Sequence, residues 1–230
     1  MYENYGTEGF SQLDGMYGFS LYDANLKKVF ICRDYFGEKP VYYYPTDDAL
    51  FVASELKSIM NVVDVKPEIS KKGLNLFFRL TYIPSPYTIY EGIHKLPPNS
   101  MLTYCLVQHN YKISSIIPDK APLKNSMSFD AAKDKVKELV TQSVSLRSIA
   151  DVPLGTFLSG GVDSSIVSYC LSEMSNTKID TFSIGFDNPD YDETNKSRIV
   201  ADLINSNHHE FIIKESDLSE DIDEIILEFN

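Results

Sequence analysis

The segment best suited to chemistry is PLGTFLSGGVDSS, residues 153–165. An apolar stretch, predicted as a strand over 154–159, runs into Ser159-Gly160-Gly161, and a helix is predicted over 163–174. Free backbone N–H groups at the positive end of a helix bind anions, and glycine leaves room for a ligand to approach. The segment therefore predicts a phosphate-binding loop.

Side chains around this loop extend the prediction. The hydroxyls of Ser159 and Ser164 can donate to an anion, whereas the carboxylate of Asp163 only accepts, which predicts it as a ligand of Mg²⁺ bridged to phosphate. The structural alternative is a serine-glycine turn that only caps a helix. The apolar stretch before the loop and the Asp-Ser-Ser after it argue against that alternative.

Two commoner phosphate motifs are excluded. Gly155 and Gly160 have the spacing at which a Walker A motif starts, but Gly161 and Val162 stand where that motif requires Lys and Ser or Thr. A GxGxxG dinucleotide fingerprint is also absent from the sequence. The loop must therefore hold its phosphate without the Walker lysine.

The elements around the loop are predicted by hydrophobic periodicity. Ser128 is a candidate N-cap of one long amphipathic helix, whose apolar or small positions recur at steps of three and four. These positions are Phe129, Ala132, Val136, Leu139, Val140, Ser143, Val144 and Ile149. The predicted strands 154–159, 181–186 and 211–213 then alternate with helices over 163–174 and 193–205, which indicates βαβ units and a parallel sheet. A last apolar helix face begins at Leu218.

The first part of the chain has a different pattern. Short runs rich in strand-forming residues, broken by turn signals, predict an antiparallel meander over 15–22, 29–33, 41–44 and 50–53. Short helices are predicted over 54–60 and 74–80, the second entered through Ser70. Prolines cluster from 83 to 122, which predicts irregular chain with at most short strands such as 101–104. The expected organisation is a first domain over 1–108, a linker over 109–126 and a second domain over 127–230.

The loop and several other segments of the chain resemble a known protein family. SGGVDS resembles the SGGxDS pyrophosphate loop of the ATP pyrophosphatase superfamily, and residues 151–165 are similar to the synthetase domain of glutamine-dependent asparagine synthetases. FSIGFDNPDYDE (182–193) and HHE (208–210) resemble later parts of that domain. Three segments of the predicted first domain look like the latter part of a class II glutamine amidotransferase domain. They are residues 14–44, VASELKSI at 52–59 and KLPPNS at 95–100.

The resemblance implies an α/β and α+β fold: a partial antiparallel amidotransferase sheet, then a partial, three-stranded, Rossmann-like parallel sheet with helices. It also implies a ligase that hydrolyses glutamine, passes the ammonia to a second domain, and there adenylates aspartate with ATP and Mg²⁺. By motif matching, the pyrophosphate end of ATP would be held by Ser159, Gly160, Gly161, Asp163 and Ser164. Leu158 and Ile184 match positions that contact the adenosine, and Asp163 would hold Mg²⁺.

Departures from the family pattern shape further expectations. The amidotransferase nucleophile is a cysteine at the mature N-terminus, but here Tyr2 follows Met1, and Cys32, the first cysteine, lies in an apolar strand and is predicted as core. No catalytic residue is therefore assigned, and the chain is expected not to hydrolyse glutamine. The family's sheet has strand order 3-2-1-4-5, so a chain with strands 1 to 3 would leave strand 1 at an edge. We expect an incomplete piece that keeps the pyrophosphate loop and associates with a complementing chain or a second copy.

Other readings of the resemblance stay open. A related amidotransferase with a glycan or β-lactam acceptor would share this two-domain plan, and a split or truncated product could bind nucleotide without catalysis. A stand-alone ATP pyrophosphatase, such as a tRNA-modifying enzyme, would leave the segment 14–44 unexplained. The two adjacent histidines His208 and His209 would point to opposite faces of a strand, so they cannot chelate one metal together and are expected to be structural or solvent-facing.

Composition restricts the partners. The 230 residues are 43% hydrophobic with a net charge of −12, so no basic footprint for nucleic acid is present in the sequence as a whole. Cys32, Cys105 and Cys170 are spaced too widely for CxxC pairs and are predicted as buried thiols in a reducing compartment. No stretch approaches the roughly 18 apolar residues of a membrane span. The expected location is the cytoplasm, without membrane or nucleic-acid partners.

Overall fold

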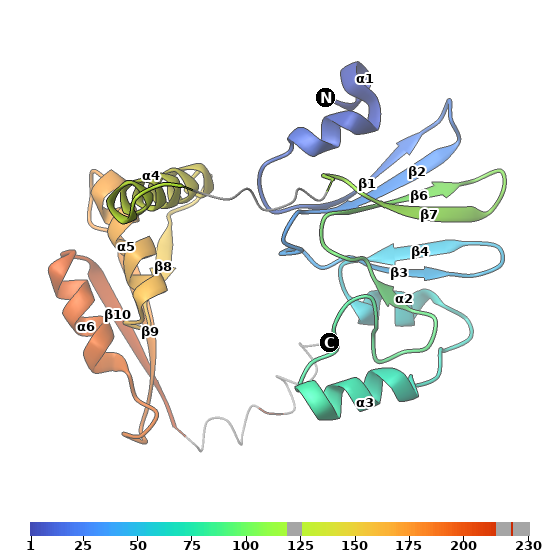
Figure 1. Cartoon of the computed structure of the whole chain (residues 1–230). Helices are drawn as coiled ribbons and strands as arrows, with labels where there is room; N and C mark the ends of the chain where they lie inside the picture. The colour runs from blue at the N-terminus through green and yellow to red at the C-terminus, as the bar shows by residue number, and fades with distance from the viewer. Residues whose placement is uncertain (119–125, 215–221, 223–230) are drawn as a thin grey trace. The chain divides into compact units, whose positions relative to one another are not determined.

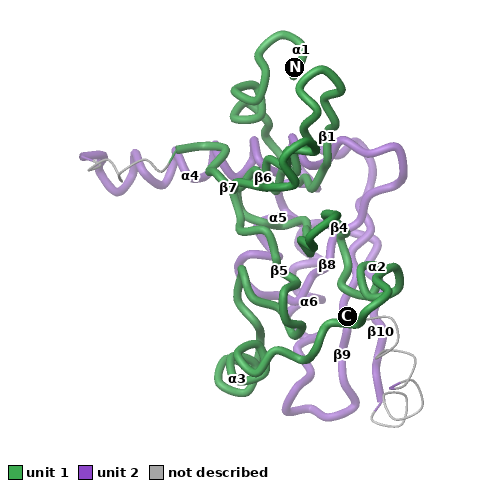
Figure 2. The backbone as a smooth tube through the Cα atoms, turned by 90° about the vertical axis from the view of Figure 1, so that its right-hand side faces the viewer, with its two compact units in different colours: residues 1–122, 230 green, residues 123–229 purple. Residues whose placement is uncertain are grey.

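A computed structural model describes residues 1–118, 126–214 and 222. The chain divides into two compact units, residues 1–122 and 123–229, drawn in two colours in Figure 2. Both antiparallel and parallel sheets are present, so the predicted mixture of α and β structure is confirmed. Within the described ranges, none of the helices is both long and apolar enough to cross a membrane.

The first unit is built from two antiparallel sheets (Figure 1). One sheet has the order β1-β2-β6-β7, and the other has the order β4-β3-β5. The strands of the first sheet are β1 (Gly18–Asp23), β2 (Lys28–Arg33), β6 (Ser100–Cys105) and β7 (Asn110–Ser115). Those of the second are β3 (Tyr42–Pro45), β4 (Leu50–Ala53) and β5 (His94–Lys95).

A hydrophobic core joins these two sheets. Ile31, Leu102 and Tyr104 from the first sheet pack with Val41, Tyr43 and Leu96, and all six are buried. Strand β6 alternates buried and half-buried residues, as expected for a strand with one face on a core. Cys32 has 0% exposure and packs with Phe10 and Phe30 in a second cluster, so its prediction as core is confirmed.

The structure corrects one prediction for this unit and adds two N-terminal elements that were not predicted. Strand β7 occupies residues 110–115, inside the range 109–126 that was predicted as linker. Its residues are mostly exposed, so it carries no apolar run, and it follows a turn in which His109 has φ 51°. At the N-terminus, helix α1 (Tyr2–Tyr5) and the 3₁₀ helix η1 (Gly6–Gln12) were not predicted; they are ordered by Phe10, which is 4% exposed against the sheet.

Two helices follow the second sheet's first hairpin, α2 (Leu56–Val62) and α3 (Lys71–Leu80). Ser70 caps α3 as predicted: its hydroxyl oxygen accepts a hydrogen bond from the amide of Gly73 at 3.2 Å. Replacing Ser70 with alanine is expected to lower the free energy of unfolding by about 1 kcal/mol, because a helix-terminal N–H loses its acceptor. Urea denaturation measures this change, and Ser58→Ala, at an exposed position inside α2, is the matched control, with no loss expected. Equal losses in both variants would contradict the capping role.

The second unit holds a parallel sheet of order β10-β9-β8. Its strands are β8 (Gly155–Phe157), β9 (Asp180–Phe186) and β10 (Asn207–Ile213), joined through α5 (Val162–Met174) and α6 (Thr194–Leu203). The predicted βαβ alternation is thus confirmed, with β10 longer than predicted and β8 shorter. Among the described residues β8 pairs with β9 alone, so it lies at an edge as expected.

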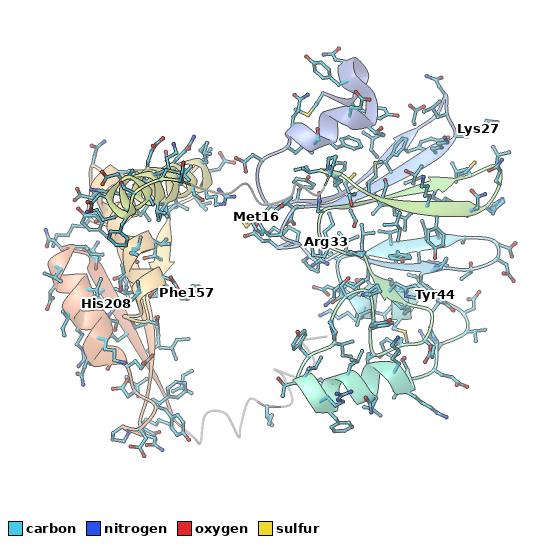
Figure 3. All side chains as sticks on the ribbon, in the orientation of Figure 1. Met16, Lys27, Arg33, Tyr44, Phe157 and His208 are labelled. Atoms are coloured by element: carbon cyan, nitrogen blue, oxygen red, sulfur yellow. The ribbon has the colours of Figure 1, made fainter. Side chains whose placement is uncertain are left out.

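The two faces of this sheet differ. On the face that α5 and α6 cover, the β9 residues Thr181, Ser183 and Gly185 are buried. On the opposite face, Phe157 is 81% exposed and Ile184 is 53% exposed. Figure 3 shows Phe157 and His208 on these opposite sides of the sheet. Parallel sheets are normally covered on both faces; within the described part of the chain this one is covered on one.

Helix α4 (Phe129–Arg147) precedes this sheet and packs against α5. The Ser128 hydroxyl accepts from the amide of Ala131 at 3.3 Å, so the predicted N-cap is confirmed. The predicted apolar stripe is less buried than expected: none of the helix residues is fully buried, and Phe129 is 83% exposed. The amphipathic segment predicted from Leu218 lies outside the described residues, except for Ile222, which is exposed.

Candidate functional site

The predicted phosphate loop lies where β8 ends. Leu158, 1% exposed, is held by β9 through both of its backbone groups. Its amide donates to the carbonyl of Phe182 at 2.8 Å, and its carbonyl accepts from the Ser183 hydroxyl at 2.5 Å. Ser159, Gly160 and Gly161 then lead directly into α5. The carboxyl ends of parallel strands are the usual ligand-binding edge of open α/β sheets, so the loop has the location that phosphate binding requires.

The two glycines of the loop have different structural roles. Gly160 has φ +77°, and a Cβ there would lie 2.5 Å from the Cβ of Lys196 and 2.7 Å from the backbone nitrogen of Ser197. It is glycine because the loop packs tightly on the first turns of α6. At Gly161 a Cβ would meet only the hydroxyl of Ser159, at 3.4 Å. Of the two glycines, Gly161 is the one with open space beside it, and the binding of a ligand there stays a prediction.

Hydroxyl groups surround Gly161. The hydroxyl oxygens of Ser159 and Ser164 are 3.0 Å apart, and the Ser159 oxygen also lies 3.4 Å from the amide of Gly161, which donates to it. The Gly161 carbonyl accepts from the hydroxyls of Ser164 at 3.2 Å and Ser165 at 2.6 Å. The Gly161 carbonyl is thereby turned toward the helix, which favours an anion on the N–H side.

Asp163 lies in the first turn of α5, and its side chain is exposed. Among the described residues there is no group of three or more His, Cys, Asp or Glu side chains that could hold a metal ion. A single exposed carboxylate at this position fits Mg²⁺, which is commonly bound through one or two carboxylates together with substrate phosphates and water. The donors present, one carboxylate beside hydroxyls and backbone amides, suit a magnesium–phosphate ligand.

The two residues matched to adenosine contacts are not brought together on one surface. The Leu158 side chain is buried, whereas Ile184 is 53% exposed on the face of the sheet that the helices leave open. Alternation along a strand accounts for this, because Phe157, one residue before Leu158, is the exposed neighbour of that open face. Ile184 can therefore offer its side chain to a base, whereas the side chain of Leu158 is buried and both of its backbone groups bond to β9.

The sequence reasoning missed the residues that support the loop from β9 and α6. At the start of α6, the Asp192 carboxylate accepts from the hydroxyl of Thr194 at 2.9 Å and from its amide at 3.2 Å. These hydrogen bonds hold the pKa of Asp192 below its usual value. Asp followed two residues later by Thr is typical of an Asx turn, in which the Asp side chain accepts from the backbone two residues on, and this pattern could have revealed the support. Nothing in the sequence alone marks Ser183, which reaches the loop only through strand pairing.

The cysteines and histidines have structural surroundings. Burial raises the pKa of Cys32 to about 12, so its thiol is not a nucleophile at neutral pH. Cys170 is also buried, but Cys105 is only half-buried, which corrects its prediction as a buried thiol. Cys105 is the last residue of β6, just before the turn into β7. His208 faces the Thr181 hydroxyl of β9, whereas the His209 ring stacks on the Phe182 ring with their centroids 5.0 Å apart. The two histidines therefore do not share a site.

Comparisons with known proteins agree with this geometry. Residues 1–112 match the glutamine amidotransferase domain family, and residues 135–229 match the asparagine synthase family. A putative glutamine-hydrolysing asparagine synthetase of Methanocaldococcus jannaschii is 36% identical over 97% of this chain and 44% of its own length. Asparagine synthetase 1 of Bacillus subtilis is 29% identical over 100% of this chain and 36% of its own.

A third relative extends the similarity to a vertebrate. The asparagine synthetase of Gallus gallus is 31% identical over 94% of this chain and 38% of its own length. The chain thus spans less than half the length of each of these curated relatives. Along this chain the amidotransferase match comes first and the synthase match second. The chain belongs to the family of glutamine-hydrolysing asparagine synthetases.

Proposed function

We propose that this chain binds Mg·ATP at residues 158–164 and that this site serves the ATP-dependent conversion of aspartate to asparagine. The observation that carries the proposal is the position of Gly161, open to a ligand at the N-terminus of α5 and flanked by Ser159, Ser164 and Asp163. The chain's membership of the asparagine synthetase family supplies the reaction class. On this proposal the parallel sheet is the beginning of an ATP pyrophosphatase-type domain, and the first unit is the latter part of an amidotransferase domain.

The reaction explains why a pyrophosphate loop is needed. A carboxylate resists attack by ammonia, so the side-chain carboxylate of aspartate first attacks the α-phosphorus of ATP and pyrophosphate leaves. Ammonia, released from glutamine, then attacks the acyl carbon of the aspartyl adenylate, and AMP leaves as the amide forms. The N–H groups at the start of α5 and the hydroxyls of Ser159 and Ser164 would stabilise the negative charge of the departing pyrophosphate.

Each residue of the site has a role in this proposal. Gly160 sets the loop on α6, and Gly161 lets the phosphates approach the backbone. Asp163 would hold Mg²⁺, which neutralises phosphate charge when bound. The exposed side chain of Ile184 would contact the adenosine, and Leu158, the other residue matched to the adenosine, would set the start of the loop through its bonds to β9. We place the protein in the cytoplasm, where ATP, aspartate and glutamine are present.

The substitution Asp163→Asn tests the metal-binding role. We expect about tenfold weaker binding of Mg·ATP in calorimetric titration, because the amide has no charge to offer the cation. Binding of ATP in the presence of EDTA should change little, since Asp163 then faces no metal. The melting temperature should stay close to that of the wild type, because the side chain is exposed.

Glu173→Gln is the matched control for this experiment. Glu173 is an exposed acid near the other end of the same helix, so its neutralisation removes one charge from α5 without touching the loop. Its affinity for Mg·ATP should equal that of the wild type. Equal affinities for wild type and Asp163→Asn would remove the metal-binding role, and a wild-type chain that gives no heat with Mg·ATP or Mg·pyrophosphate would remove the proposed function.

A further inference from the structure

A side-chain hydrogen bond links the phosphate loop to the neighbouring strand. The hydroxyl of Ser183 donates to the carbonyl of Leu158, the residue immediately before the loop, at 2.5 Å. Ser183 is only 4% exposed, so water has little access to replace this bond. We propose that Ser183 is a positioning residue for phosphate binding, which fixes the Leu158 carbonyl and thereby aims the amides of the loop at the ligand. This inference rests on the proposed function of the loop.

The loop is held at two points, and Ser183 supplies one of them. At its start, Leu158 is held to β9 by its amide as well as by its carbonyl. At its middle, Gly160 packs directly on the backbone of α6. The peptide units around Ser159 lie between these points. Loss of the Ser183 bond releases the Leu158 carbonyl and leaves the first point held by the Leu158 amide alone, so the loop amides then sample orientations that do not face one anion.

The surroundings of Ser183 direct its proton toward Leu158. His208 Nε2 lies 3.4 Å from the Ser183 oxygen and 3.3 Å from a carboxylate oxygen of Glu210, and Glu210 is paired with Arg198 through two contacts of 2.6 Å. His208 Nδ1 lies 2.8 Å from the hydroxyl of Thr181. We assign Nδ1 as the acceptor of the Thr181 proton and Nε2 as the protonated nitrogen, since Glu210 can only accept.

This assignment fixes the roles of the hydroxyl. With Nε2–H directed at Glu210 and at the Ser183 oxygen, Ser183 is an acceptor toward His208 and keeps its own proton for the Leu158 carbonyl. Ser183 is the member of this network that hydrogen-bonds to the residue before the loop, so the loop depends on the Ser183 hydroxyl itself.

The test compares two variants of the full chain, Ser183→Ala and Thr181→Val. Each removes one buried hydroxyl from the same face of β9, and both hydroxyls have His208 as a neighbour, but only Ser183 contacts Leu158. Both variants should unfold at lower temperature than the wild type. Calorimetry on folded protein should show Mg·ATP and Mg·pyrophosphate binding weakened at least fivefold by Ser183→Ala and changed less than twofold by Thr181→Val.

Hydrogen exchange of the ligand-free chain separates this inference from the proposed function. Ser183→Ala should speed exchange of the Leu158 amide at least fivefold, whereas Thr181→Val should leave it near the wild-type rate. Wild-type affinity and exchange in Ser183→Ala, or equal losses in both variants, would overturn the positioning role. A wild-type chain that binds no Mg·ATP would overturn the proposed function, and the exchange rates alone would then decide whether Ser183 anchors the loop. Ser183→Cys, a weaker donor, should give an intermediate loss and serves if the alanine variant does not fold.

Discussion

Replacing Gly160 with alanine is expected to lower the affinity for Mg·ATP roughly a hundredfold and to destabilise the second unit by about 3 kcal/mol. The reason is steric. The new Cβ would lie 2.5 Å from the Cβ of Lys196 and 2.7 Å from its carbonyl carbon, and φ +77° is unfavourable for a residue with a side chain. The loop must then move away from α6, which displaces several phosphate donors together. Titration with Mg·ATP and urea denaturation measure the two losses.

Gly161→Ala is the matched control for the loss of stability, because it adds the same methyl group one residue later. Gly161 has φ −72° and ψ 163°, a conformation open to any residue, and its new Cβ would meet only the Ser159 hydroxyl at 3.4 Å. Its stability should therefore stay within about 0.5 kcal/mol of the wild type. Mg·ATP affinity should still fall, because the methyl group occupies the side from which phosphate approaches. If Gly161→Ala binds normally, the ligand does not lie over this glycine; if Gly160→Ala binds normally, the contact with α6 does not shape the loop.

These two glycines show how far the sequence could predict the site. The string from Pro153 to Ser165 located the loop between a strand and a helix, because glycine, capping residues and apolar periodicity are local signals. It could not separate the roles of Gly160 and Gly161, because the contact with Lys196 and Ser197 depends on how α6 packs. Ser183 was missed for the same reason: its bond to Leu158 spans 25 residues and depends on the pairing of β8 with β9.

The fold shows the same division between local and long-range information. The capped helices α3 and α4 and the apolar strands β2, β3 and β9 were predicted near their observed positions, because each carries a periodic or β-rich pattern. Strand β7 was missed because an exposed strand needs no apolar run once β6 supplies its hydrogen bonds. Exposure was predicted least well. Phe129 follows a good capping residue and fits an apolar stripe, yet it is 83% exposed, since periodicity identifies a face without identifying what covers it.

The substitution Asp34→Asn is expected to destabilise the first unit by about 3 kcal/mol at neutral pH. Asp34 is 0% exposed, and its carboxylate accepts from the amides of Glu38 at 2.8 Å and Lys39 at 2.9 Å. Its neighbour Arg33 is 7% exposed and donates to the carbonyls of Gly37, Lys39 and Leu96. An asparagine side chain would turn its N–H₂ group toward the amide of Glu38 or of Lys39, which are both donors. It would also remove a negative charge that stabilises the buried Arg33 guanidinium. Chemical denaturation of the full chain measures the loss, and Asp47→Asn, in an exposed turn, is the control with no loss expected.

The pH dependence of this difference identifies its electrostatic origin. Burial alone would raise the pKa of Asp34, but the backbone hydrogen bonds from Lys39 and Glu38 outweigh it and hold the pKa below its usual value. A carboxylate whose pKa is lower in the folded state stabilises the fold above its unfolded pKa, and that contribution disappears as the pH falls through the folded pKa. The gap in unfolding free energy between wild type and Asp34→Asn should therefore be constant from about pH 5 to pH 8 and narrow below about pH 4. A gap that stays unchanged in acid would show that shape and packing, rather than the charge accepted by these amides, account for the loss.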